Sequence, residues 1–166
     1  MAFNCTAWWH QVGAPSTIAT VGLRRRVPRK PPIKIKDMTL LNLNRFPVLK
    51  SLFLESNEIT KIDGLENCHE IRHLVLDRNR IKDIEPGALI GQWRLEELHI
   101  DGNRLTTLGN LRHLVNLKRL YIGLNRIQEI AEISKLSALQ NLTEISMIGN
   151  GVARRMLHRL VTIILG

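Results

Sequence analysis

Residues able to do chemistry are sparse in this chain, and they form no familiar catalytic set. Glu97 and Asp101 are a carboxylate pair, the residue type used for general acid–base catalysis, but nothing indicates burial or a partner for either. His73 and His99 could bind a metal ion, but no third ligand accompanies them. Ser/His/Asp combinations occur only by chance, and Cys68 falls at an apolar position, which indicates packing. We therefore expect no catalytic residue, no metal site and no cofactor.

An asparagine set among aliphatic residues in LFLESNEITKI, residues 52–62, is a second candidate for chemistry. It recurs at similar intervals along the chain, as Asn57, Asn79, Asn103, Asn125 and Asn150. A catalytic residue is not usually copied once per structural unit, whereas a buried turn needs partners for its backbone groups in every copy. An amide side chain both donates and accepts hydrogen bonds, so we interpret this set as a structural asparagine ladder.

These asparagines belong to a repeated pattern, L-x-x-L-x-L-x-x-N-x-I/L-x-x-I/L. Copies start at residues 49, 71, 95, 117 and 142, spaced 22, 24, 22 and 25 residues apart, and residues 37–48 match the second half of a further copy. The first apolar positions alternate with polar ones, as in a half-buried strand, and the later ones recur every three residues, as in a 3₁₀ turn or short helix. One copy cannot close its own core, so neighbouring copies must stack.

The pattern resembles the leucine-rich repeat family, and in particular its 22-residue class, typified by a regulatory subunit of protein phosphatase-1. The resemblance covers about residues 37–160. It implies an α/β repeat solenoid, a horseshoe with a short parallel β-sheet on the concave face and 3₁₀ or helical segments on the convex face. Residues 98–133 and 146–159 also resemble part of one long intracellular member of the family, of which this chain would be a short form.

The two ends depart from the pattern. Residues 1–36 match no repeat and carry four prolines and a basic cluster, so we expect a basic, disordered segment; a mitochondrial targeting segment is the alternative. Residues 150–166 resemble the start of the family's helical cap, with Gly151 in place of the expected proline and no closing strand. The expected organisation is an N-terminal segment over 1–36, repeats over 37–149 and an incomplete amphipathic helical cap over 150–166.

Charge and cysteine content narrow the function classes. The 166 residues are 44% apolar and carry a net charge of +9, but residues 37–149 are close to neutral, so the basic excess lies at the two ends. Basic ends would suit an RNA- or ribonucleoprotein-associated adaptor. The two cysteines form no disulfide framework, and no apolar run approaches the roughly 20 residues of a membrane span. We expect an intracellular, cytoplasmic monomer.

The outward positions of the expected strands predict a binding surface. Exposed aromatic side chains surrounded by charge are typical of protein-binding hot spots, and solenoids present extended concave surfaces. An ordinary solvated strand face is the competing interpretation. The candidate protein-binding residues of the concave face are Phe53, Glu55, Asp77, Glu97, His99, Asp101, Arg119 and Tyr121.

A further outward column holds arginines in three of its four places, at Glu58, Arg80, Arg104 and Arg126. Arginines in register could bind phosphate or an acidic peptide, but solvated arginines paired with nearby acids are the plainer interpretation. The leading functional hypothesis is a non-catalytic scaffold that binds a partner protein, of unknown identity, on the concave face. The family also suggests ciliary or cytoskeletal association, and nucleic-acid binding by the basic ends is the alternative.

Overall fold

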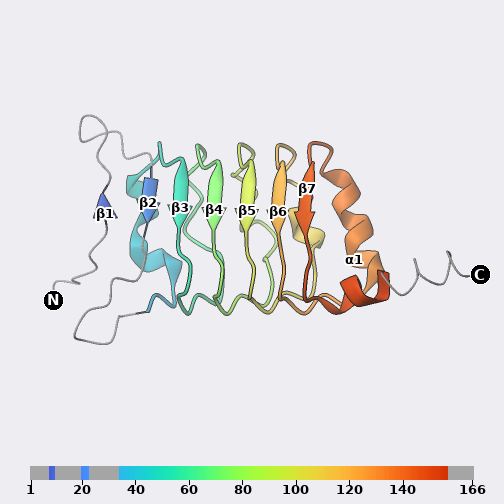
Figure 1. Cartoon of the computed structure of the whole chain (residues 1–166). Helices are drawn as coiled ribbons and strands as arrows, with labels where there is room; N and C mark the ends of the chain where they lie inside the picture. Colours follow the sequence, from blue (N-terminus) through green and yellow to red (C-terminus); the bar gives the residue numbers. More distant parts are fainter. Residues whose placement is uncertain (1–7, 10–19, 23–33, 157–166) are drawn as a thin grey trace, which may run out of the picture.

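The computed structural model describes residues 8–9, 20–22 and 34–156 of the chain. Strands stack in chain order into one seven-stranded sheet, in which β1 is antiparallel to β2 and all later neighbours are parallel (Figure 1). The strands are β1 (Trp8–Trp9), β2 (Thr20–Gly22), β3 (Ser51–Phe53), β4 (His73–Val75), β5 (Glu97–His99), β6 (Arg119–Tyr121) and β7 (Glu144–Ser146). The helical elements are η1 (Met38–Leu41), η2 (Leu43–Arg45), η3 (Gly109–Leu111), α1 (Ile130–Ser134), η4 (Lys135–Ala138) and residues 151–156.

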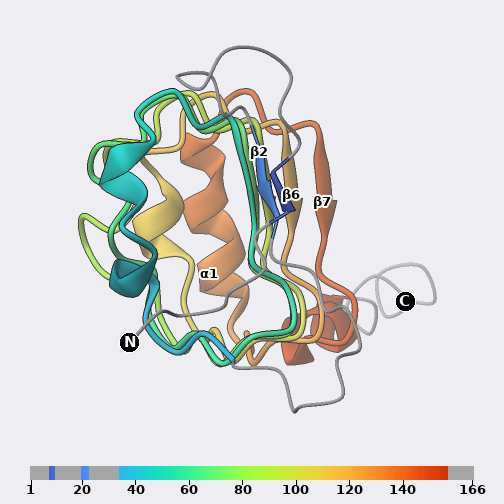
Figure 2. The same ribbon diagram turned by 90° about the vertical axis from the view of Figure 1, so that its left-hand side faces the viewer.

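The stack has two unlike sides (Figure 2). The strands line one side, and α1 and the 3₁₀ segments lie on the opposite side. This arrangement confirms the α/β repeat solenoid predicted from the sequence, with a parallel sheet on the concave face and 3₁₀ or helical segments on the convex face. None of the helices within the described residues has the length and apolar composition that crossing a membrane requires.

Parallel pairing in register places equivalent residues of successive repeats side by side. Leu52, Leu74 and Leu98 are Cα partners across β3, β4 and β5, and all three are fully buried. Their strand neighbours point to the other face and are half-buried, as the two-residue period of a strand requires. Stacking removes each leucine from water on both sides of its layer, which stabilises the stack by about 1.5–3 kcal/mol per side chain.

Burial falls off in the last strand. Ile145 of β7 is the Cα partner of Leu120, yet it is 38% exposed, because no described strand lies beyond β7. The helix at residues 151–156 buries Val152 completely, and the Val152 N–H donates to the Ile127 carbonyl. The expected cap therefore begins as a helix, and its remainder, residues 157–166, lies outside the described residues.

The N-terminal segment differs from the disorder expected over residues 1–36. Thr20–Gly22 forms β2, which pairs in parallel with β3 and places Val21 opposite Leu52. β2 thus supplies the strand that the half repeat at residues 37–48 lacked. This strand could not be predicted from the sequence, because its pairing depends on backbone hydrogen bonds and no leucine pattern at the usual spacing marks it. The rest of the segment, residues 1–7, 10–19 and 23–33, lies outside the described residues.

Within the half repeat, not every apolar residue reaches the core. Leu40 is 71% exposed, whereas Met38 and Leu43 are buried and Leu41 is partly buried against the core. The 3₁₀ helix η1 explains the difference, because three residues per turn bring Met38 and Leu41 to the same side and turn Leu40 away.

Candidate protein-binding site

Two residues of each strand face the hollow side of the sheet, because they alternate with a buried leucine. In-register pairing aligns them into two columns along β3 to β7. The first column holds Ser51, His73, Glu97, Arg119 and Glu144, and the second holds Phe53, Val75, His99, Tyr121 and Ser146.

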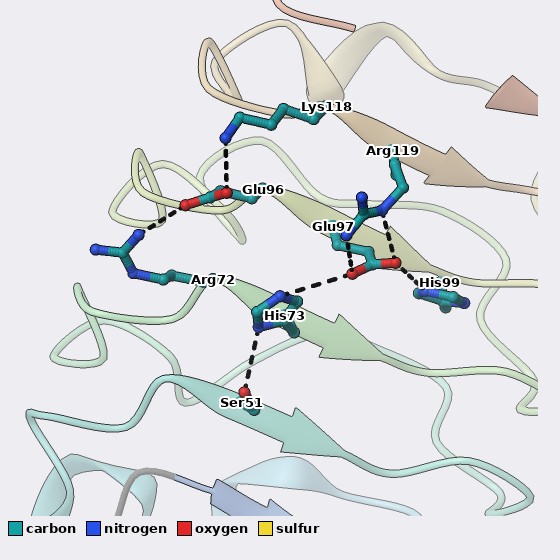
Figure 3. A network of polar contacts seen from close by, with 8 residues as sticks. All are labelled: Ser51, Arg72, His73, Glu96, Glu97, His99, Lys118 and Arg119. Carbon is teal, nitrogen blue, oxygen red and sulfur yellow. Dashed lines mark hydrogen bonds and ion pairs between the residues drawn. The ribbon is translucent and has the colours of Figure 1, made fainter. Parts of the chain in front are cut away.

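Glu97 of β5 is the centre of a polar network in the first column (Figure 3). Arg119 of β6 donates from Nε to Oε1 and from Nη2 to Oε2, each at 2.9 Å. His99 Nε2 lies 3.1 Å from Glu97 Oε1, and His73 Nε2 lies 3.6 Å from Oε2. The bidentate bond from Arg119 lowers the pKa of Glu97 to about 2, with a smaller contribution from His99. Glu97 is therefore ionised at neutral pH and holds Arg119 in a fixed orientation.

Ser51, His73 and Glu97 lie in an order that resembles a hydrolytic triad. Ser51 Oγ is 3.3 Å from His73 Nδ1 (Figure 3). The geometry does not fit nucleophile activation, because the 3.6 Å between His73 and Glu97 exceeds hydrogen-bond range and both oxygens of Glu97 already accept from Arg119. From the sequence, we expected Ser/His/Asp combinations to occur only by chance. The structure brings Ser51, His73 and Glu97 together as a polar network.

The sequence also raised Cys68 and a metal site as candidates for chemistry. Cys68 is fully buried, and its thiol lies 3.3 Å from the Leu43 carbonyl, to which it donates. Burial raises the pKa of Cys68, which keeps the thiol protonated. Among the described residues, no group of three or more His, Cys, Asp or Glu side chains could hold a metal ion.

Tyr121 and His99 stack in the second column. Their ring centroids are 4.3 Å apart with an interplanar angle of 30°, and Tyr121 Oη donates to Glu144 Oε1 at 2.8 Å. This hydrogen bond to an anionic acceptor raises the pKa of Tyr121. Because the stack and the hydrogen bond both fix the ring, Tyr121 has little rotamer freedom to lose when it is covered by a ligand.

The concave face is hollowed beside this stack. The hollow has a volume of about 520 Å³, within the range of roughly 300–1,000 Å³ that is usual for binding sites. It combines an apolar part with charged and polar side chains, and its lining includes Phe53, Glu55, Val75, Asp77, Glu97 and His99. Five of the eight predicted site residues therefore line one hollow. The structure places the other three beside it: Asp101, Arg119 and Tyr121.

The predicted acidic stripe also supports the backbone. Asp77 Oδ1 accepts from the Asp101 N–H at 2.8 Å, and Asp101 Oδ1 accepts from the Gly123 N–H. Burial raises the pKa of Asp77, and the charges of Asp101 and Glu55 raise it further against the backbone hydrogen bond. The sequence interpretation missed this structural role, although an aspartate two residues before the asparagine in consecutive repeats was its signal.

Asn103 illustrates the asparagine ladder. Its Nδ2 donates to the carbonyls of Leu76, Ile100 and Asp101 at 3.0–3.2 Å, and its Oδ1 accepts from the Ile81 N–H at 3.0 Å. Leu76 and Ile81 belong to the preceding repeat, so one amide ties two turns together. Each of the other four likewise accepts a backbone N–H from the preceding layer and donates to its own turn: Asn57, Asn79, Asn125 and Asn150.

The arginine column divides into paired and unpaired members. Arg80 Nη2 donates to Glu58 Oε1 at 3.1 Å, as the plainer sequence interpretation expects. Arg104 and Arg126 are exposed, and neither forms a hydrogen bond or an ion pair through its side chain within the described residues. Pairing with nearby acids is therefore wrong for these two arginines.

Sequence reasoning also passed over two exposed apolar side chains, Leu124 and Ile148. They are 66% and 76% exposed, and the Leu124 N–H donates to the Ile148 carbonyl at 2.6 Å. Both follow the concave strand positions, where earlier repeats carry polar residues or glycine. Their departure from that pattern was the available signal.

The in-register parallel strands, the return segments and the asparagine ladder together define a repeat solenoid with one concave sheet face. Residues 47–105 and 69–127 match the family model described as Leucine rich repeat. Solved solenoids of the same family superpose on the chain, and the chain belongs to the leucine-rich repeat family.

Two curated relatives and one solved structure illustrate the similarity. Tubulin-specific chaperone E of Dictyostelium discoideum is 33% identical over 116 residues, which span 68% of this chain and 20% of the relative. Dynein axonemal light chain 1 of Chlamydomonas reinhardtii is 40% identical over 120 residues, spanning 72% of this chain and 59% of the relative. The crystal structure of an internalin C2 from Listeria monocytogenes superposes with a TM-score of 0.67 at 28% identity, covering 80% of this chain and 53% of that one.

Proposed function

We propose that the chain is a non-catalytic scaffold that binds a partner protein on its concave leucine-rich-repeat face. The observation that carries this proposal is the hollow of about 520 Å³, in which Phe53 and Val75 lie beside ionised groups. Apolar and aromatic area surrounded by charge is the composition of binding hot spots, because the apolar part drives association and the charges select the partner.

The rigidity of the face supports the same proposal. Arg119 is held by two hydrogen bonds to Glu97, and Tyr121 by its stack on His99 and its bond to Glu144. A surface whose long side chains are already ordered loses less conformational entropy when a partner binds. No such pre-ordering is needed on a merely solvated strand face.

The relatives suggest the kind of partner. One relative is by name a tubulin-specific chaperone and another a light chain of axonemal dynein. We therefore place the partner among cytoskeletal or ciliary proteins, and propose that the chain acts there as a monomer. This chain spans only a fifth to three fifths of those relatives, so the assignment concerns the repeat region that they share.

Affinity capture with the full chain as bait tests the concave site. Phe53→Ala and Tyr121→Ala each remove an aromatic side chain from the second column, and a protein bound there should be lost from the captured set. Trp93→Ala is the matched control, because Trp93 is 47% exposed, lies under the Arg94 guanidinium and belongs to the return segment between β4 and β5. A captured protein that both concave variants release and the control retains supports the proposal; a set unchanged by either concave variant refutes it.

A further inference from the structure

Leu124 and Ile148 form an apolar pair on the outside of the molecule, just after β6 and β7. They are 66% and 76% exposed and joined by the hydrogen bond from the Leu124 N–H to the Ile148 carbonyl. Asp77 and Asp101, at the position equivalent to Ile148 in earlier repeats, are polar and half-buried, so this position lies at the surface of the stack and not in its apolar core.

Leu124 stands where the backbone favours another residue. Its φ is +52°, in the left-handed region that the equivalent residue of every other repeat also adopts, at Ser56, Arg78, Gly102 and Gly149. A leucine in this conformation costs roughly 1–2 kcal/mol, and at 66% exposure it gains little from burial in return.

Gly149 makes room for this side chain. A Cβ added at Gly149 would lie 2.6 Å from Leu124 Cδ2, so the leucine extends over the glycine of the next repeat. Leu124 and Ile148 are thus linked through the backbone, and the Leu124 side chain lies against the residue that follows Ile148.

Two exposed arginines belong to the turn of Leu124 and to the turn one repeat earlier. Arg126 follows Leu124 by two residues, and Arg104 holds the same position one repeat earlier, on a layer roughly 4.8 Å away. Two acids of these layers have other partners, because Asp83 accepts from Thr107 Oγ1 and Glu129 pairs with Arg155. Within the described residues no carboxylate neutralises Arg104 or Arg126.

We propose that Leu124, Ile148, Arg104 and Arg126 form a second docking surface, which binds an acidic protein segment carrying apolar side chains. An apolar anchor with guanidinium groups beside it is complementary to leucine or phenylalanine flanked by carboxylates. This surface is distinct from the concave hollow and opposite to it in charge. A protein segment is favoured over RNA because these four residues include no aromatic side chain, and single-stranded RNA is usually held by stacking on aromatic rings.

Fluorescence anisotropy with the full chain and labelled probes tests this surface. The probe is the octapeptide Glu-Glu-Leu-Glu-Glu-Leu-Glu-Glu, compared with octaglutamate and with octauridylate RNA. We expect the leucine-containing peptide to bind most tightly, with affinity that falls as salt is raised. Tighter binding of octauridylate would overturn the proposal in favour of RNA. Equal binding of octaglutamate would show that the apolar pair does not contribute to binding, and would also overturn the proposal.

Matched variants locate the binding. The double variant Arg104→Gln/Arg126→Gln should weaken the peptide about tenfold, as expected for roughly 1.4 kcal/mol of lost interaction. Arg45→Gln/Lys50→Gln removes the same charge from exposed residues elsewhere and should leave affinity unchanged; an equal loss in this control overturns the proposal. Leu124→Asn should also weaken binding while it retains the fold, since asparagine tolerates the left-handed conformation. Phe53→Ala should not, which separates this surface from the concave site.

Discussion

Asn103 and Asp101 lie two residues apart, and each satisfies backbone groups of a neighbouring repeat. Asn103 joins the turns of two layers through one amide, and Asp101 accepts the Gly123 N–H of the next layer. Polar side chains that looked like candidates for chemistry are thus partly structural. The distinction matters for mutagenesis, because loss of these residues should act on stability before it acts on binding.

Asn103→Ala should lower the free energy of unfolding by about 1–3 kcal/mol, because it leaves the buried Ile81 N–H without a partner and removes one of the two side-chain hydrogen bonds to each of the Leu76 and Ile100 carbonyls. Urea denaturation followed by circular dichroism measures the change. Asn44→Ala, at an exposed position in η2, is the control and should change stability by less than about 0.5 kcal/mol. Equal midpoints for the two variants would show that the ladder carries no stability.

Asp77→Asn should raise stability at neutral pH by no more than about 1 kcal/mol. The folded-state pKa of Asp77 is raised, mainly by burial, so its ionised form opposes folding above the ordinary value of 3.8, and this penalty vanishes as pH falls below about 4. Asparagine keeps an oxygen for the Asp101 N–H. Thermal unfolding of parent and variant at pH 7 and pH 3.5 tests the sign: a gain that persists unchanged at pH 3.5 would contradict it.

At the scale of elements, β5 and β6 are joined by side chains as well as by backbone. The bidentate bond from Arg119 to Glu97 runs between adjacent strands on the concave face, and Glu96 is bridged separately by Arg72 and Lys118 (Figure 3). Cross-strand ion pairs of this kind fix the register and order the surface that a partner would meet.

Arg119→Gln should lower the stability at pH 7, because it removes both hydrogen bonds of the bidentate pair with Glu97. Because the pKa of Glu97 is lowered to about 2 from 4.5, this contribution is complete above pH 4.5 and is lost as pH falls toward 2. The stability difference between parent and variant should therefore shrink over that window. Arg72→Gln, which removes the same charge from a single hydrogen bond at an exposed pair, should cost less at pH 7; an equal or larger loss would contradict the special role of Arg119.

At the scale of the whole molecule, strands outside the repeat pattern cover the N-terminal edge of the stack. β2 covers the open edge of β3 on the N-terminal side, and β1 adds a short antiparallel strand beyond it. An uncovered edge strand offers unpaired backbone groups to other molecules. The N-terminal segment is therefore part of the solenoid at Thr20–Gly22, even though its sequence shows no repeat.

Val21→Pro removes a backbone N–H from β2 and should lower stability by about 1–3 kcal/mol while raising concentration-dependent aggregation. Val21→Ala keeps the N–H and is the matched control. Thermal unfolding combined with light scattering measures both effects. If the proline and alanine variants unfold at the same temperature and scatter equally, β2 does not contribute to the folded sheet.

The sequence by itself determined the solenoid, its layer spacing and the position of the asparagine ladder, because these follow from short-range apolar periodicity repeated along the chain. It also predicted which residues face the concave side, since alternation with Leu52, Leu74 and Leu98 fixes that orientation. Only the tertiary structure decided how those residues interact. Arg119 donates to Glu97, which lies 22 residues earlier in the sequence, and β2 pairs with β3 although no leucine pattern marks β2. Such contacts between layers depend on register and backbone pairing, which no local sequence pattern encodes. The lack of a side-chain partner for Arg104 and Arg126 within the described residues was likewise visible only in the structure.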